Sequence, residues 1–174
     1  MINIDTYKSL IINAIDNIDM VSLLSAVDVI RDGDNIYICG NGGAATASIH
    51  MANDLQKMGN KNAISLASNI SLVTAWANDE DYKKIFTRQL EKLYDREKKN
   101  VLILLSGSGT SKNIVDVGKF AINNNFNVIL ITGNPYNGLR NHPVNIICLD
   151  SIMQVTEDMF MIINHMIALE LYNE

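Results

Sequence analysis

The chain has 174 residues, of which 48% are apolar and 19% charged, and its formal net charge is −5. This balance predicts one globular domain with a sizeable core. No basic block occurs, which argues against a nucleic-acid partner. No leader and no apolar run of membrane-spanning length is visible, so we expect a cytoplasmic protein without a membrane partner. Cys39 and Cys148 lie inside apolar runs, which argues against disulfides.

Apolar residues recur at helical spacing over residues 3–31, with a break predicted at Asn17–Asp19. Adjacent pairs such as Leu23 and Leu24 put apolar side chains on more than one side of the second helix. A small sheet cannot cover all of them. We therefore expect residues 1–33 to form a helical arm that packs on another subunit.

Strands and helices alternate over the rest of the chain. Strands are predicted at Ile36–Cys39, Ala63–Ala67, Val101–Leu105, Val128–Thr132 and Val144–Leu149. Helices are predicted after the glycine turn at 40–43 and at Leu72–Ala77, Tyr82–Tyr94, Lys112–Asn123 and about Met153–Leu171. This alternation predicts an α/β fold, namely a three-layer, doubly wound, flavodoxin-like sheet of five parallel strands with right-handed crossovers and a long C-terminal helix.

The stretch 101–111, VLILLSGSGTS, has the pattern of an anion site. A buried strand runs into a turn rich in glycine and hydroxyl groups, and a helix follows, whose first amides are unpaired. The alternative is that Thr110 or Ser111 only caps this helix. The turn is neither a Walker loop nor a dinucleotide fingerprint, so we expect a small phosphorylated molecule and not a nucleotide.

A second glycine turn, Gly40–Gly43, also follows a predicted strand. In parallel α/β sheets, ligands bind outside the carboxyl ends of the strands, near the point where the strand order reverses. Both turns lie at such ends. We therefore expect the Gly40–Gly43 and Ser106–Gly109 turns to face one pocket.

Two predicted helices each carry a histidine and a carboxylate on one face. His50 and Asp54 are four residues apart, and Glu157 and His165 are eight apart. Such groups suit a divalent metal or an acid/base pair. The alternatives are a solvated helix residue for His50 and a core-edge residue bonded to the backbone for His165.

Four stretches, in this order and spacing, resemble the phosphoheptose isomerases of the sugar isomerase (SIS) domain family: GNGGAATASIHMANDLQ, TAWANDEDYKKIFTRQLEKL, LLSGSGTSKNIV and TEDMFMIINHMIALEL. The resemblance covers nearly the whole chain and implies a single SIS domain at residues 1–174. It also implies a homotetramer with sites at subunit interfaces and one zinc ion per subunit. The implied reaction converts sedoheptulose 7-phosphate to D-glycero-D-manno-heptose 7-phosphate, for heptose supply to surface polysaccharide.

The resemblance also assigns roles to residues. Asp54 would be the base and His165 the acid. The substrate-binding residues would be Asn41, Gly42, Gly43, Asp79, Ser106, Gly107, Ser108, Ser111 and Glu157. The implied zinc ligands are His50, Asp54, Glu157 and His165.

The chain departs from the family pattern at several of these positions. Ala44 replaces a serine, Asp54 a glutamate and Glu157 a glutamine, while Gly107 and Thr110 replace threonine and asparagine. These departures leave two alternatives open. One is a non-catalytic SIS-domain regulator that binds the replication initiator protein, and the other is an isomerase of a different sugar phosphate. Because a scaffold has no physical need for His50 and His165, the enzyme is favoured.

Overall fold

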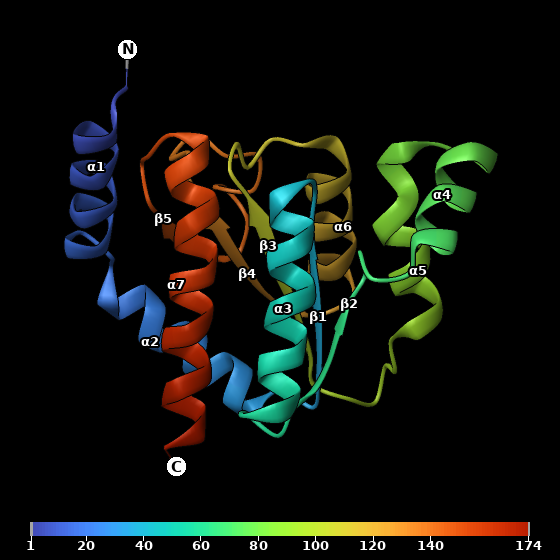
Figure 1. Cartoon of the computed structure of the whole chain (residues 1–174). Helices are drawn as coiled ribbons and strands as arrows, with labels where there is room; N and C mark the ends of the chain where they lie inside the picture. Colours follow the sequence, from blue (N-terminus) through green and yellow to red (C-terminus); the bar gives the residue numbers. More distant parts are fainter. Residues whose placement is uncertain (1, 174) are drawn as a thin grey trace.

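The structure is a computed structural model that describes residues 2–173 (Figure 1). Seven α-helices, one 3₁₀ helix and five strands alternate along these residues. In chain order they are α1 (Ile4–Asp16), α2 (Met20–Asp32), β1 (Asn35–Gly40), α3 (Gly43–Lys57), β2 (Asn62–Ser65), α4 (Ile70–Asp79), the 3₁₀ helix η1 (Tyr82–Lys84), α5 (Ile85–Leu93), β3 (Asn100–Ser106), α6 (Lys112–Asn123), β4 (Asn127–Thr132), β5 (Asn145–Cys148) and α7 (Met153–Tyr172).

Most predicted elements are confirmed, and the differences have local causes. The strand expected at Ala63–Ala67 ends at Ser65, because the Ser65 carbonyl oxygen accepts the Ser68 amide and closes a turn. The helix expected at Tyr82–Tyr94 begins as η1, where the Asp81 side chain accepts the Lys83 amide. The predicted break between the first two helices is present, and Asp19 caps α2 there.

The five strands form one sheet in the order β2-β1-β3-β4-β5, and every neighbouring pair is parallel. This is the predicted flavodoxin-like order. The chain moves outward from β1 to β2, and then returns to the other side of β1 for β3. The carboxyl ends of β1 and β3 therefore flank the point at which the strand order reverses, where a ligand is expected.

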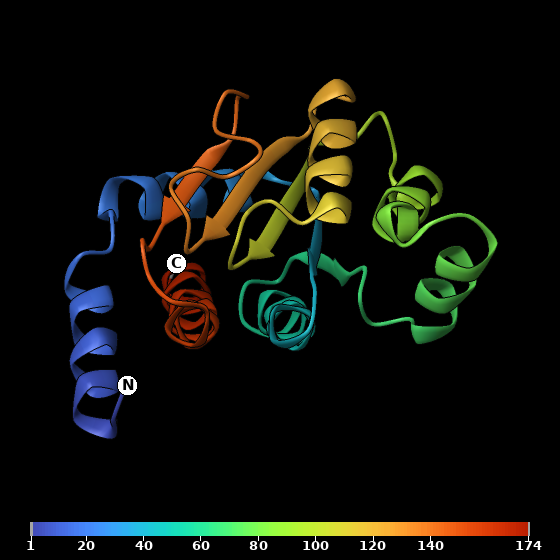
Figure 2. The same ribbon diagram turned by 90° about the horizontal axis from the view of Figure 1, so that it is seen from above.

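Helices cover both faces of the sheet, which confirms the three layers (Figure 2). Alternate residues of β3 point to opposite faces. Val101, Ile103 and Leu105 join a buried cluster with α2, α3 and α7. Leu102 and Leu104 join a second cluster with α5 and α6. Each such buried aliphatic side chain contributes about 1.5–3 kcal/mol to stability.

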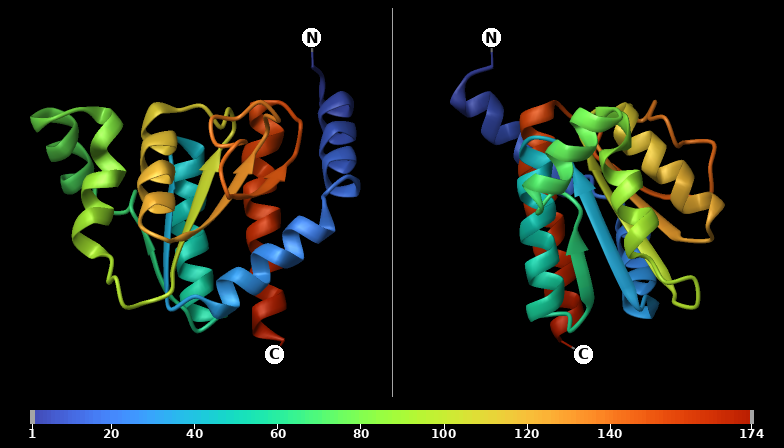
Figure 3. Two further views of the ribbon diagram at one scale, coloured as in Figure 1. Left: turned by 180° about the vertical axis from the view of Figure 1, so that it is seen from behind. Right: turned by 90° about the vertical axis from the view of Figure 1, so that its right-hand side faces the viewer.

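Helices α1 and α4 lie at opposite ends of the sheet (Figure 3). The Tyr7 hydroxyl of α1 donates a 2.5 Å hydrogen bond to Asp158 of α7, and this bond raises the pKa of Tyr7. Helix α4 is rich in apolar residues, yet none of them is buried. Within residues 2–173 no single helix could span a membrane, and α1 and α2 reach that length and composition only together, with a 66° bend between them.

Candidate active site

A cavity of about 290 Å³ lies at the carboxyl ends of β1 and β3. Both glycine turns line it, as predicted. Its lining consists of Asn41, Gly42, Ala44, Leu105, Ser106, Gly107, Ser108, Ser111, Met153 and Glu157. The cavity is therefore formed by the predicted phosphate turn, the start of α3 and the start of α7.

The turn after β3 is shaped by its own serines. The Ser106 hydroxyl accepts the Gly109 amide at 3.1 Å, and the Ser108 hydroxyl accepts the Thr110 amide at 3.3 Å. Gly109 has a φ of +63°, which is strained for residues with a side chain. Ser111 is the N-cap residue of α6, but its side chain makes no capping hydrogen bond. Helix capping thus does not account for the hydroxyl of Ser111.

The turn after β1 opens helix α3 without a side-chain cap. Gly42 is the N-cap residue, with a φ of +58°. The Ala44 and Ala45 amides donate to the carbonyl oxygens of Asn41 and Gly42, at 3.1 and 3.0 Å, and the positive end of the helix dipole lies at this turn. Ala44, which replaces the family's serine, is buried and supplies no hydroxyl. What this end of the cavity can offer an anion is therefore the positive end of a helix dipole.

Asn41 joins the two turns. Its side-chain amide exchanges hydrogen bonds with that of Asn113 on α6, at 3.0 and 2.8 Å. The Tyr82 hydroxyl also donates to the Asn41 oxygen, at 3.1 Å. Asn41 was predicted to bind substrate, and in the structure its amide group holds the loop before α3 against α6.

Glu157 lies at the other side of the cavity. Its carboxylate packs so closely on Gly43 that a Cβ added there would be 2.7 Å from a carboxylate oxygen. Met153, one turn earlier on α7, packs on Gly107 in the same way. If Gly107 had a Cβ atom, the Met153 sulfur would be only 2.2 Å from it. Both glycines are thus needed for the close approach of α7 to the cavity.

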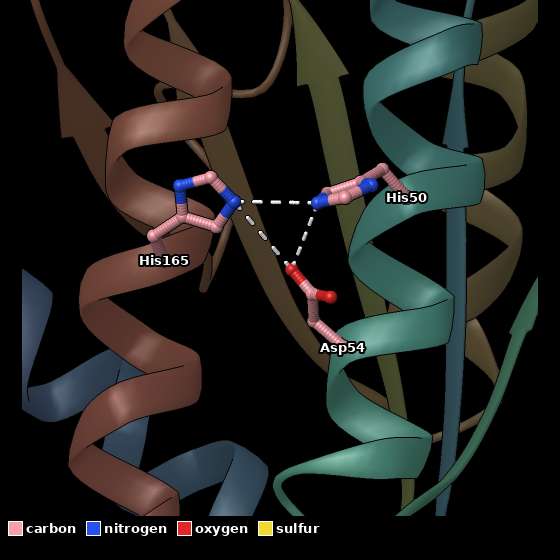
Figure 4. A group of neighbouring side chains, drawn as sticks. All are labelled: His50, Asp54 and His165. Carbon is pink, nitrogen blue, oxygen red and sulfur yellow. Dashed lines mark hydrogen bonds and ion pairs between the residues drawn. The ribbon is translucent and has the colours of Figure 1, made fainter.

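His50, Asp54 and His165 come together between α3 and α7 (Figure 4). The two Nε2 atoms are 3.2 Å apart. Asp54 Oδ2 lies 3.1 Å from His50 Nε2 and 3.7 Å from His165 Nε2. The Asp54 side chain is 11% exposed and the His165 side chain 53%. The buried Asp54 oxygen and the Nε2 atoms of the two accessible histidines therefore lie close together, and the three side chains point toward one another (Figure 4).

The spacing of these three atoms fits a tetrahedral metal ion. Zinc bonds of about 2.0–2.1 Å place two tetrahedral ligand atoms about 3.3 Å apart, and the measured separations run from 3.1 to 3.7 Å. Imidazole nitrogen and carboxylate oxygen are ligands that zinc accepts. Three protein ligands also leave one position for a substrate, as in catalytic zinc sites.

Two predicted site residues lie away from this group. Glu157 and His165 are separated by eight residues on α7, a rise of about 12 Å, and the Glu157 carboxylate lies at Gly43 rather than beside the imidazoles. Asp79 is exposed at the end of α4, where its carboxylate accepts a hydrogen bond from Asn78. The described residues therefore bring together three of the four predicted ligands.

Sequence reasoning missed several residues that shape the site: Asn113, which holds Asn41, Tyr82, which also bonds Asn41, Met153, which covers Gly107, and Asn164, which donates a 2.7 Å hydrogen bond to Asp54. Asn164 had a signal in the sequence. It is an amide within the apolar run FMIINHMIAL, directly before His165, and buried polar side chains need partners.

Comparisons with known proteins identify the family of this chain. A family model described as SIS domain matches residues 5–133. A phosphoheptose isomerase from Leptospira biflexa is 33% identical over 150 residues, which cover 82% of this chain and 76% of that protein. One from Helicobacter pylori is 42% identical over 94 residues. That match covers 51% of this chain and 48% of the relative, so it spans about half of the relative's length.

Two solved structures share the fold. Phosphoheptose isomerase GmhA from Neisseria gonorrhoeae superposes with a TM-score of 0.86 at 21% identity, over 97% of each chain. A phosphoheptose isomerase from Francisella tularensis has a TM-score of 0.84 at 20% identity, over 98% of this chain and 94% of that one. These identities establish likeness of fold. Since the family model covers most of the chain and the fold agrees, the protein belongs to the SIS domain family, and its relatives by sequence include phosphoheptose isomerases.

Proposed function

We propose that this protein is a sugar-phosphate isomerase of the phosphoheptose isomerase type, which interconverts sedoheptulose 7-phosphate and D-glycero-D-manno-heptose 7-phosphate. The observation that carries the proposal is the convergence of His50, Asp54 and His165 near the cavity that both glycine turns line. Ala44, which lines this cavity, lies six positions before His50 on α3, a rise of about 9 Å. An extended sugar phosphate can reach from one to the other.

The cavity would hold the phosphate. Ser108 and Ser111 carry hydroxyl donors, and the start of α3 adds the positive end of a helix dipole. Binding energy at this remote group positions the carbonyl end of the sugar for reaction. The substrate would then extend from this cavity toward His50 and His165, with carbons 1 and 2 at the histidines.

The reaction needs one base and one acid. From ketose to aldose, a proton leaves carbon 1 and a proton is returned to carbon 2, while the hydroxyl proton passes from oxygen 1 to oxygen 2. Asp54 and His165 have the chemistry for these transfers. The same groups, with His50, could instead hold zinc, which when bound would polarise the sugar oxygens. In either arrangement, charge that develops on oxygen meets positioned groups.

We propose further that residues 1–174 form a single SIS domain that assembles as a homotetramer with sites at subunit interfaces. The family model ends at residue 133, but α7 supplies His165 and Glu157 to the site and packs along α3. Apolar side chains on α2 and α4 stay exposed in the isolated chain. Contact with other copies would cover them.

The direct test is to incubate the purified protein with sedoheptulose 7-phosphate and to follow the appearance of the aldose. We expect conversion by the wild type and none by His165→Asn. A protein that binds no sugar phosphate and forms no aldose would refute the proposal, and it would favour the regulator that binds the replication initiator. Conversion of another ketose phosphate alone would keep the reaction and correct the substrate.

A further inference from the structure

Asn164 is buried beneath the histidines. It lies on α7 directly before His165 and is 1% exposed. Its Nδ2 donates a 2.7 Å hydrogen bond to Asp54 Oδ2. Its own Oδ1 is the one buried side-chain oxygen or nitrogen without a partner in the part of the chain that the structure describes. The Asn164 amide group therefore bonds Asp54 through its nitrogen, and its oxygen is left without a hydrogen bond.

Stability alone does not account for this arrangement. A buried polar atom without a hydrogen bond is costly to the fold, and that cost offsets what the hydrogen bond to the Asp54 carboxylate contributes. Turning the amide over would not help, because its oxygen would then face the Asp54 carboxylate. Local departures from a well-satisfied core are expected where a residue serves a site.

The contact fixes one particular atom. Asp54 Oδ2, which receives the Asn164 hydrogen bond, is the same oxygen that lies near both imidazoles. Among residues 2–173, the other oxygen, Oδ1, accepts one hydrogen bond, a longer one of 3.2 Å from the exposed Asn53. An amide behind a carboxylate restricts its rotation, as hydrogen bonds to metal ligands do elsewhere.

We propose that Asn164 is a positioning residue, which holds Asp54 Oδ2 toward the point shared by the two histidines and so makes Asp54 a fixed metal ligand rather than a mobile base. The shorter aspartate suits this role, since it has one rotatable bond fewer than the family's glutamate. The inference rests on the proposed function in taking His50, Asp54 and His165 as the working centre.

The test measures zinc affinity in the absence of any sugar. Metal-free protein is titrated with Zn²⁺ in competition with a chromophoric chelator. We expect Asn164→Leu to weaken zinc binding about ten- to hundredfold. The melting temperature of its metal-free form should change little, because removal of the unsatisfied oxygen offsets the loss of the hydrogen bond to Asp54. The control is Asn53→Ala, which removes the hydrogen bond to Oδ1 and should leave zinc affinity unchanged.

A double-mutant comparison checks that Asn164 acts through Asp54. In an Asp54→Ala background, Asn164→Leu should cause no further loss of zinc affinity. An equal loss in both backgrounds, or full zinc affinity in Asn164→Leu, would overturn the inference. If the leucine variant does not fold, Asn164→Ala replaces it in both measurements.

Failure of this inference can be told from failure of the proposed function. A wild type that binds zinc but leaves sedoheptulose 7-phosphate unchanged would refute the isomerase and not the role of Asn164. A wild type that binds no zinc would overturn the inference even if it isomerises the sugar.

Discussion

Ser108 and Ser111 both carry hydroxyl donors on the cavity wall. We expect Ser108→Ala and Ser111→Ala each to raise the half-saturating concentration of sugar phosphate tenfold or more, because a hydrogen bond to a charged group is worth about 1.5–3 kcal/mol. Steady-state kinetics measure the change. Thr110→Val is the control, since Thr110 lines a separate hollow beside Lys112. Unaltered saturation in both serine variants would place the phosphate elsewhere.

His165 is the most accessible member of the histidine–carboxylate group. His165→Asn should lower turnover about a hundredfold or more, the scale for losing an acid/base group, while the fold stays intact because the side chain is half exposed. Turnover and the melting temperature are measured together. His142→Asn, in an exposed loop, should keep full activity. A comparable loss in that control would point to a general disturbance.

Among the elements, η1 and α5 are joined to α6 through one carboxylate. Asp116 accepts hydrogen bonds from Lys84 at 3.0 Å and Thr87 at 2.7 Å. Burial alone would raise the pKa of Asp116, but hydrogen bonds from Thr87, Lys84 and Lys83 outweigh it and hold the pKa below the usual 3.8. The ionised carboxylate thus favours the folded state.

This pairing predicts a pH-dependent stability. The contribution of Asp116 is present above pH 3.8 and is lost as the pH falls through the lower folded-state pKa. We expect Asp116→Asn to cost about 1–2 kcal/mol at pH 7 and to differ less from wild type near pH 3. Chemical denaturation at both pH values measures this. Asp28→Asn, in an exposed pair with Arg31, should change little at either pH.

The elements were largely predictable because their signals are local. The α6 helix begins and ends at the predicted residues. A hydroxyl-rich turn precedes its first residue, Lys112, and Asn125, which has a φ of +62°, follows its C-terminal end. The contacts of the site were not local. His50 meets His165 across 115 residues, and Asn41 meets Asn113 across 72. Periodicity places such residues on a helix face, but only the packing of α3 beside α7 decides which faces meet.

At the scale of the whole molecule, exposed apolar side chains remain. On α2, Val21 is 79% exposed and Leu24 is 48% exposed. Leu24 lines a groove together with Leu169 of α7, which is also exposed. We expect Leu24→Asp to dissociate the proposed tetramer, because burying an unpaired charge in an interface is energetically costly. Sedimentation at micromolar concentration measures the assembly. Asn123→Asp, which adds the same charge at an exposed site on α6, should leave it unchanged. A monomeric wild type would contradict the tetramer.

The paired amides of Asn41 and Asn113 have a kinetic consequence. They hold the loop after β1 against the helix after β3, so the two walls of the proposed phosphate cavity are preorganised before any ligand arrives. A preorganised cavity loses little conformational entropy on binding. It also needs no slow closure, so the observed association rate should rise in proportion to sugar-phosphate concentration without reaching a plateau. We therefore expect the binding of a sugar phosphate to be limited by diffusion and orientation.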